Sequence, residues 1–245
     1  MNAKDSAAIR VFLINGFRSI LWGLERLIES RHPAMRVVGT ATSSAEALEK
    51  IVDAVPDLIL LDVDLGKEEV TATITKLKAQ SPAKILILTG SRNGSLPDRA
   101  MIAGASGVVR KESPAETILT AIDKVYQGEL WLDRATMGRA LARIPEERPT
   151  QTSDLEQAKI ASLTVREREI VALATNNPRA SAAALAEMLG ITEHTLRNHL
   201  TSIYEKLDVS GRLTMSALAY KHGLASAPPT SQGDNTSARR RWRRD

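Results

Sequence analysis

The chain has 245 residues, of which 43% are hydrophobic but only 3% aromatic, and its formal net charge is +4. This length suits about two domains of roughly 100–200 residues each, with cores built from aliphatic side chains. Cysteine is absent, which excludes disulfides and thiolate metal sites. There is no hydrophobic signal core and no apolar run near the roughly 20 residues of a membrane span, so we expect a cytoplasmic protein without a membrane partner.

The first half of the chain alternates between two patterns. Amphipathic stretches at helical spacing separate short apolar runs, and strands that alternate with helices indicate a parallel sheet covered on both faces. We therefore predict an α/β fold, a doubly wound (βα)5 domain, over residues 1–128. The predicted strands are Val11–Ile14, Val37–Thr40, Leu58–Leu61, Ile85–Thr89 and Val108–Arg110.

The middle of the chain, residues 129–160, is predicted to be a helical extension followed by a linker. The extension is "WLDRATMGRALARI", and the next stretch, "PEERPTQTSDLEQAK", has the prolines and polar charges typical of an exposed connection. At the far end, residues 226–245 lack a core and carry five arginines around Trp242. We expect a disordered basic tail there, either as a phosphate-neutralising arm or as a solubilising segment.

Residues 161–225 are predicted to be all-α. Thr164 and Glu167 form a possible capping box, and Ser181 and Thr192 can cap the next two helices, with Gly190 between them. A short helix, a turn containing glycine and a longer helix are typical of a helix-turn-helix domain.

The longer helix has two distinct faces at about 100° per residue. The apolar stripe, which should face the core, is Leu196, Leu200, Ile203 and Leu207; the opposite side carries His194, Asn198, Thr201 and Glu205. Such a polar face suits the edges of bases in a major groove, although an ordinary solvated face has the same pattern.

Three polar side chains follow predicted strands of the first domain. Asp62, Thr89 and Lys111 should meet at one edge of the sheet, where ligands bind in open α/β folds. A carboxylate that accepts a phosphoryl group, with a hydroxyl and an ammonium that hold its oxygens, suits phosphoryl chemistry.

The first domain resembles the receiver domain of bacterial response regulators in "PDLILLDVDLG", "KILILTGS" and "GASGVVRKESPAETILTAI". The resemblance implies that Asp62 stands at the phosphoacceptor position, Thr89 at the switch hydroxyl and Lys111 at the family's lysine.

The departures from that family pattern are informative. Asn15 and Gly16 occupy the positions of the two acidic residues that hold Mg²⁺ in the family, and Val108 replaces the usual aromatic switch residue. Since Mg²⁺ requires hard oxygen ligands, we expect neither Mg²⁺ nor any other metal or cofactor. Phosphoryl transfer depends on charge neutralisation, so we expect a receiver that is silent in this chemistry.

Two alternatives remain open for this edge. Asp62 and Lys111 can form a static ion pair, or Asp62 can be phosphorylated in the cell with substitute ligands from Asp64, Glu68 and Glu69. The Asp-x-Asp in "LILLDVDLG" also occurs in haloacid-dehalogenase-type phosphatases. The acidic pair that should follow the lysine in those enzymes is missing, so we do not expect an enzyme and assign no catalytic residue.

The second domain resembles the LuxR-type DNA-binding domain of the NarL/FixJ class in "LTVRERE", "ITEHTLRNHLTSIYEKLDVSGR" and "ALAYKHG". The resemblance places Arg197, Asn198 and Thr201 at base-contacting positions. It places four further residues where the family approaches phosphates or braces the helix, namely Thr195, His199, Lys206 and Arg212. Its final helix corresponds to the family's dimerisation position.

We therefore expect a two-component-type transcription regulator that binds double-stranded DNA as a homodimer and works without phosphorylation. Its expression level, a protein partner or a small-molecule ligand at the receiver would then set its activity. Two other functions stay open: a conventional regulator phosphorylated on Asp62, and a modulator that heterodimerises with other regulators without binding DNA.

Overall fold

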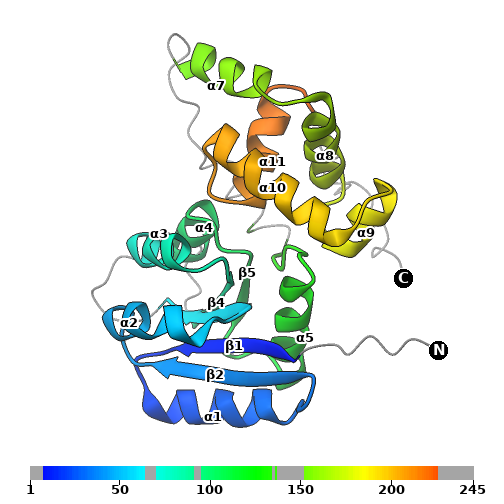
Figure 1. The fold of residues 1–245 in the computed structure, drawn as a ribbon. Coiled ribbons are helices and arrows are strands. Elements are labelled where there is room, and N and C mark those ends of the chain that lie inside the picture. The colour runs from blue at the N-terminus through cyan, green and yellow to red at the C-terminus, as the bar shows by residue number, and fades with distance from the viewer. Residues whose placement is uncertain (1–7, 64–69, 91–94, 134–135, 137–151, 226–245) are drawn as a thin grey trace, which may run out of the picture.

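The computed structural model describes residues 8–63, 70–90, 95–133, 136 and 152–225. The N-terminal domain is a five-stranded parallel sheet in the order β2-β1-β3-β4-β5 with helices on both faces (Figure 1), which confirms the predicted doubly wound (βα)5 fold. Its elements in chain order are β1 (Ile9–Ile14), α1 (Arg18–Glu29), β2 (Met35–Ala41), α2 (Ser44–Ala54), β3 (Leu58–Asp62), α3 (Val70–Gln80), β4 (Lys84–Thr89), α4 (Ser95–Ile102), β5 (Gly107–Arg110) and α5 (Ala115–Tyr126).

The sheet separates two apolar layers. Alternate residues of a strand point to opposite faces, so Phe12 and Ile14 pack towards α2, α3 and α4, whereas Val11 and Leu13 pack towards α1 and α5. Because both faces are covered, the central strands are mostly apolar, and β3 is buried throughout. All five predicted strands are confirmed.

The C-terminal domain is all-α, as predicted. Its helices are α7 (Thr152–Ala161), α8 (Val165–Asn176), α9 (Ala182–Met188), α10 (Glu193–Leu207) and α11 (Arg212–Lys221). The three predicted N-caps are confirmed, because the hydroxyls of Thr164, Ser181 and Thr192 each accept a hydrogen bond from a backbone N–H of the first turn. Gly190, at φ +65°, makes the turn between α9 and α10.

The segment between the domains is more structured than the sequence indicates. The predicted linker sequence includes α7, whose Glu156 pairs with Lys221 at 2.9 Å and with His222 at 2.7 Å. At the other end, Trp131 forms a bridge to Gly107 at the edge of the sheet instead of starting a helix. Most of the predicted helical extension, and the tail at 226–245, lie outside the described residues.

The two domains are docked against each other (Figure 1). The backbone N–H of Ala182 donates to the carbonyl of Gln127 at 2.7 Å, and the hydroxyl of Ser210 donates to the carbonyl of Ile102 at 2.6 Å. Leu213, the second residue of α11, is buried in the core of the receiver-like domain. The contact therefore combines backbone hydrogen bonds with shared apolar packing. None of the helices in the described ranges is long and apolar enough to cross a membrane.

Candidate functional site

The carboxyl edge of the sheet brings Asn15, Asp62 and Lys111 together. The amide nitrogen of Asn15 donates to Asp62 Oδ2 at 2.5 Å, and Lys111 Nζ lies 2.6 Å from the same oxygen. The amide oxygen of Asn15 accepts from the backbone N–H of Phe17 at 2.8 Å, which fixes the orientation of the amide. Asn15 and Asp62 are each only 1% exposed. Asp62 is thus a buried carboxylate that accepts a hydrogen bond from a neutral amide and forms an ion pair with Lys111.

This donor set does not fit Mg²⁺. The ion requires several oxygen ligands in octahedral geometry, whereas Asn15 presents its NH₂ group to Asp62 and Gly16 has no side chain. In the described part of the chain, no three His, Asp or Glu side chains form a group that could hold a metal. The substitute ligands considered above, Asp64, Glu68 and Glu69, lie outside the described residues.

The remaining receiver positions lie close to this edge. Thr89 ends β4 and is buried, and its carbonyl accepts a hydrogen bond from the N–H of Lys111 at 2.8 Å. Val108 is half-buried and packs against the layer formed with α2, α3 and α4.

In the C-terminal domain, α10 presents the two faces that the sequence predicts. Leu196, Ile203 and Leu207 are buried, whereas the opposite side is exposed at His194, Asn198, Thr201 and Glu205. Leu200 also packs against this core, as predicted, but it is half-buried and lines a cavity between the domains.

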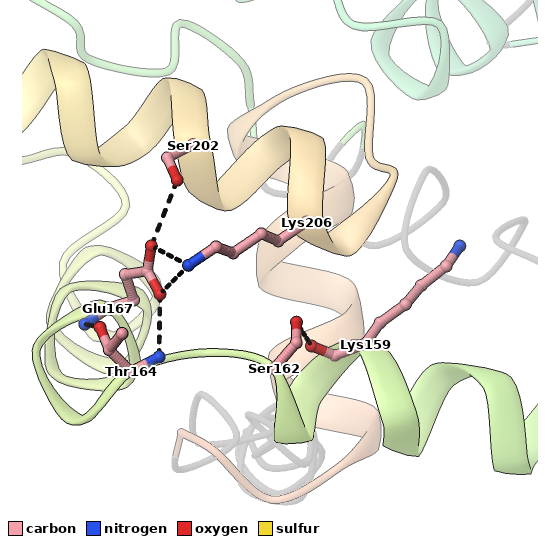
Figure 2. A network of polar contacts seen from close by, with 6 residues as sticks. All are labelled: Lys159, Ser162, Thr164, Glu167, Ser202 and Lys206. Atoms are coloured by element: carbon pink, nitrogen blue, oxygen red, sulfur yellow. Dashed lines mark hydrogen bonds and ion pairs between the residues drawn. The ribbon is translucent and has the colours of Figure 1, made fainter.

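The position of α10 is fixed by a polar network around Glu167 (Figure 2). Glu167 closes the capping box of α8 with Thr164 and accepts two hydrogen bonds from Lys206, both at 2.8 Å, and one from Ser202 at 3.3 Å. Burial opposes ionisation, but the bonds from Lys206 and Thr164 outweigh it and hold the pKa of Glu167 at about 2. The sequence indicates the cap but not this link to α10.

Two of the residues assigned to phosphate contact or bracing are held by other groups. Lys206 is paired with Glu167, and Arg212 is buried and donates to four backbone carbonyls. The acceptors of Arg212 are Gly128, Ala174, Asn177 and Ala180. Both side chains brace the domain in this arrangement, and Arg212 also ties it to the receiver-like domain through Gly128.

The other predicted contact residues lie along α10. Arg197 and Asn198 are exposed, and Thr195 and His199 are partly exposed. Arg197 Nε donates to Glu193 at 3.1 Å, one turn back along the helix.

A cavity of about 610 Å³ lies where the two domains meet, and sequence reasoning did not find it. Arg197 and Thr201 of α10 line it opposite the Lys78–Lys84 segment of the receiver-like domain. Part of the expected base-reading face therefore points at the other domain. The sequence shows Lys78 near the end of α3 and Lys84 at the start of β4, but it does not indicate which residues these lysines face.

Family models match both domains. Residues 11–123 match the response regulator receiver domain, and residues 161–219 match the bacterial regulatory proteins of the luxR family. The transcriptional regulatory protein LiaR of Bacillus subtilis (strain 168) is 31% identical over 89% of this chain and 100% of LiaR. Response regulator UvrY of Escherichia coli (strain K12) is 26% identical over 91% of this chain and 99% of UvrY.

A solved structure of a LuxR-family two-component response regulator from Aurantimonas sp. SI85-9A1 is 26% identical to this chain. It matches with a TM-score of 0.50, over 55% of this chain and 96% of that one. The chain belongs to the response regulators that join a receiver domain to a LuxR-type DNA-binding domain. It is a DNA-binding transcriptional regulator.

Proposed function

We propose that this regulator controls transcription as a DNA-binding dimer whose receiver works without Mg²⁺-dependent phosphorylation of Asp62. It would act in the cytoplasm, where its DNA target is. The observation that carries the proposal is the contact of Asn15 with Asp62. The neutral Asn15 amide donates a hydrogen bond to the carboxylate and Lys111 supplies a compensating positive charge, so Asp62 is stabilised without a divalent cation.

The loss of the metal removes the main source of catalysis at such a site. Without a cation, the negative oxygens of a phosphoryl donor approach a carboxylate unscreened, and charge neutralisation supplies most of the rate in phosphoryl transfer. The buried Asp62–Lys111 pair then has a structural function, which is to hold the carboxyl ends of β3 and β5 together.

The test is a phosphorylation assay on the full-length chain. Incubation with Mg²⁺ and acetyl phosphate should give no increase in mass, and beryllofluoride should leave the conformation unchanged, with Asp62→Asn as the matched control. A mass increase in the wild-type chain that is absent from Asp62→Asn would refute the proposal and favour the conventional regulator.

DNA reading is assigned to α10. Arg197, Asn198 and Thr201 present a guanidinium, an amide and a hydroxyl on its exposed side, which are groups that pair with base edges in the major groove. Two such helices in a dimer would meet half-sites about one helical turn apart. Fluorescence anisotropy with a selected duplex and a random duplex, together with the mass of the complex in solution, separates this function from that of a modulator that does not bind DNA.

The docked arrangement restricts access to this face. Arg197 and Thr201 are exposed but also line the cavity opposite the other domain, so a duplex can cover the whole reading face of α10 only when the domains separate. We therefore assign regulation to the equilibrium between docked and separated domains, rather than to an aspartyl phosphate.

A further inference from the structure

The interdomain cavity carries an unbalanced positive charge. Among the residues that the structure describes, four cationic side chains and one carboxylate line it. The cations are Lys78, Lys84, Arg197 and Arg212, and the carboxylate is Glu129. Glu129 is already paired with a lysine outside the cavity lining, Lys124, at 2.9 Å.

Three of these four cations have no carboxylate partner within the described residues. Lys84 Nζ donates to the carbonyl of Tyr126 at 2.7 Å, Lys78 Nζ donates to the carbonyl of Ser210, and Arg212 donates only to carbonyls. Only Arg197 is paired, with Glu193. Gathering like charges in a partly desolvated interface costs free energy unless an anion compensates them.

The charges act on one another. Burial, and then repulsion by Arg197 of α10 and Arg212 of α11, lowers the pKa of Lys84 to about 8, although Glu193 and Asp57 oppose the shift. Lys84 therefore remains mostly protonated at pH 7, in a setting that disfavours its charge.

The rest of the lining is apolar. Val125 and Leu130 of the receiver domain face Leu185 and Leu200 of the DNA-binding domain across the same space. The volume falls within the roughly 300–1,000 Å³ of small-molecule sites, which combine apolar walls with a few placed polar groups.

We propose that this cavity binds a small organic anion, with its phosphate or carboxylate group among Lys84, Lys78 and Arg197 and its apolar body against the leucines. A ligand that touches both domains is bound more tightly by the docked form, so it opposes DNA binding. The anion site stands independently of the proposed function, whereas its effect on DNA rests on that function.

The test is calorimetry on the full-length chain without DNA. The probes are 1-naphthyl phosphate and 1-naphthoate, with neutral 1-naphthol as the matched control and inorganic phosphate as the head group alone. We expect one site for an anionic naphthyl probe and no measurable binding of 1-naphthol. The better of the two anions identifies the head group. No binding of either anion would overturn the proposal.

Variants locate the site. Lys84→Gln should weaken binding of the anion about tenfold, and Lys78→Gln should do the same if Lys84→Gln fails to fold. Lys76→Gln, which removes an exposed lysine from the same helix as Lys78, should bind as the wild type does. Equal affinity for the anionic probe in the wild type and in all three variants would overturn the proposal.

A proton count gives a second readout. An anion beside Lys84 raises its pKa, so binding at pH 8 should take up protons, as measured in buffers of different ionisation enthalpy, and Lys84→Gln should abolish the uptake. Saturation with the anion should then lower the affinity for a selected duplex in the wild type only. Unchanged DNA affinity in a chain that binds both the probe and DNA would overturn the regulatory effect but leave the proposed function intact.

Discussion

The amide nitrogen of Asn15 lies 2.5 Å from Asp62 Oδ2 and donates a hydrogen bond to this buried carboxylate. Asn15 is positioned by its own backbone turn, because its amide oxygen accepts from Phe17. In the proposed function, an asparagine that donates to Asp62 stands where an acidic ligand of Mg²⁺ is expected. The missing negative charge would then explain why this receiver is not phosphorylated.

The first prediction restores the acids. Asn15→Asp combined with Gly16→Asp should create a Mg²⁺ site with Asp62, because three carboxylates then meet at one edge. We expect Mg²⁺-dependent labelling by acetyl phosphate in the double variant and none in the wild type, measured by intact mass. The triple variant that also contains Asp62→Asn should not be labelled. If the double variant did not bind Mg²⁺, features of the carboxyl edge of the sheet other than the two missing carboxylates would have to prevent metal binding.

The second prediction concerns base reading. Arg197→Ala should weaken binding to a selected duplex by about 1–3 kcal/mol and binding to a random duplex by less, because a guanidinium that pairs with guanine discriminates between sequences. Arg36→Ala removes the same charge from the exposed face of the receiver domain and should leave both affinities unchanged. An equal loss of affinity for both duplexes would mean that Arg197 contacts the DNA phosphate backbone and not the bases.

The third prediction tests the network in Figure 2. Glu167→Gln should lower the free energy of unfolding by about 2 kcal/mol, because it removes a charged acceptor shared by Lys206, Ser202 and the α8 cap. Urea denaturation measures the loss. Glu169→Gln breaks an exposed pair with Arg166 and should cost less than about 0.5 kcal/mol. Similar effects from the two variants would argue against a structural function for the buried pair.

The same group gives a pH dependence. The pKa of Glu167 is about 2 in the folded chain and 4.5 ordinarily, so the folded state binds this proton less readily than the unfolded state does. Its stabilisation is present above pH 4.5 and is lost as the pH falls towards 2. The urea midpoint should therefore fall more steeply over this range in the wild type than in Glu167→Gln. Parallel curves would contradict the prediction.

The fifth prediction locks the domains together. A Cβ built at Gly128 would lie 3.2 Å from the Cβ of Ala182, close to the separation that a disulfide requires. The chain has no cysteine, so Gly128→Cys with Ala182→Cys offers one pair only. The oxidised protein should lose specific DNA binding and regain it on reduction. The reference is the reduced double variant and not the wild type, because residue 128 has φ +90°, where any side chain adds backbone strain. Equal binding in both redox states would show that docking does not occlude α10.

The parts that the sequence predicted correctly depend on local pattern. The five strands follow from apolar runs that must be buried on both faces, and the caps at Thr164, Ser181 and Thr192 follow from hydroxyls placed directly before helices. The two faces of α10 follow from helical periodicity in the same way. Such features can be predicted without knowing which other parts of the chain pack against the helix or strand.

The parts that it did not predict depend on contacts far apart in the chain. The polar composition of α7 predicts a linker, because its stabilising pairs with Lys221 and His222 lie more than 60 residues away in the chain. In the part of the chain that the structure describes, Arg212 donates to backbone carbonyls, and every residue type has the same carbonyl, so the sequence does not indicate these contacts. The direction of the Asn15 amide depends equally on the fold around it.

Leu213 belongs to one domain by its place in the chain and to the other by its packing. A receiver fragment expressed alone would uncover the hollow that this leucine fills, and a DNA-binding fragment would display the leucine to water. Each domain studied in isolation would therefore aggregate more readily and be less stable than it is in the intact regulator. The isolated DNA-binding domain would also bind DNA without competition from interdomain docking.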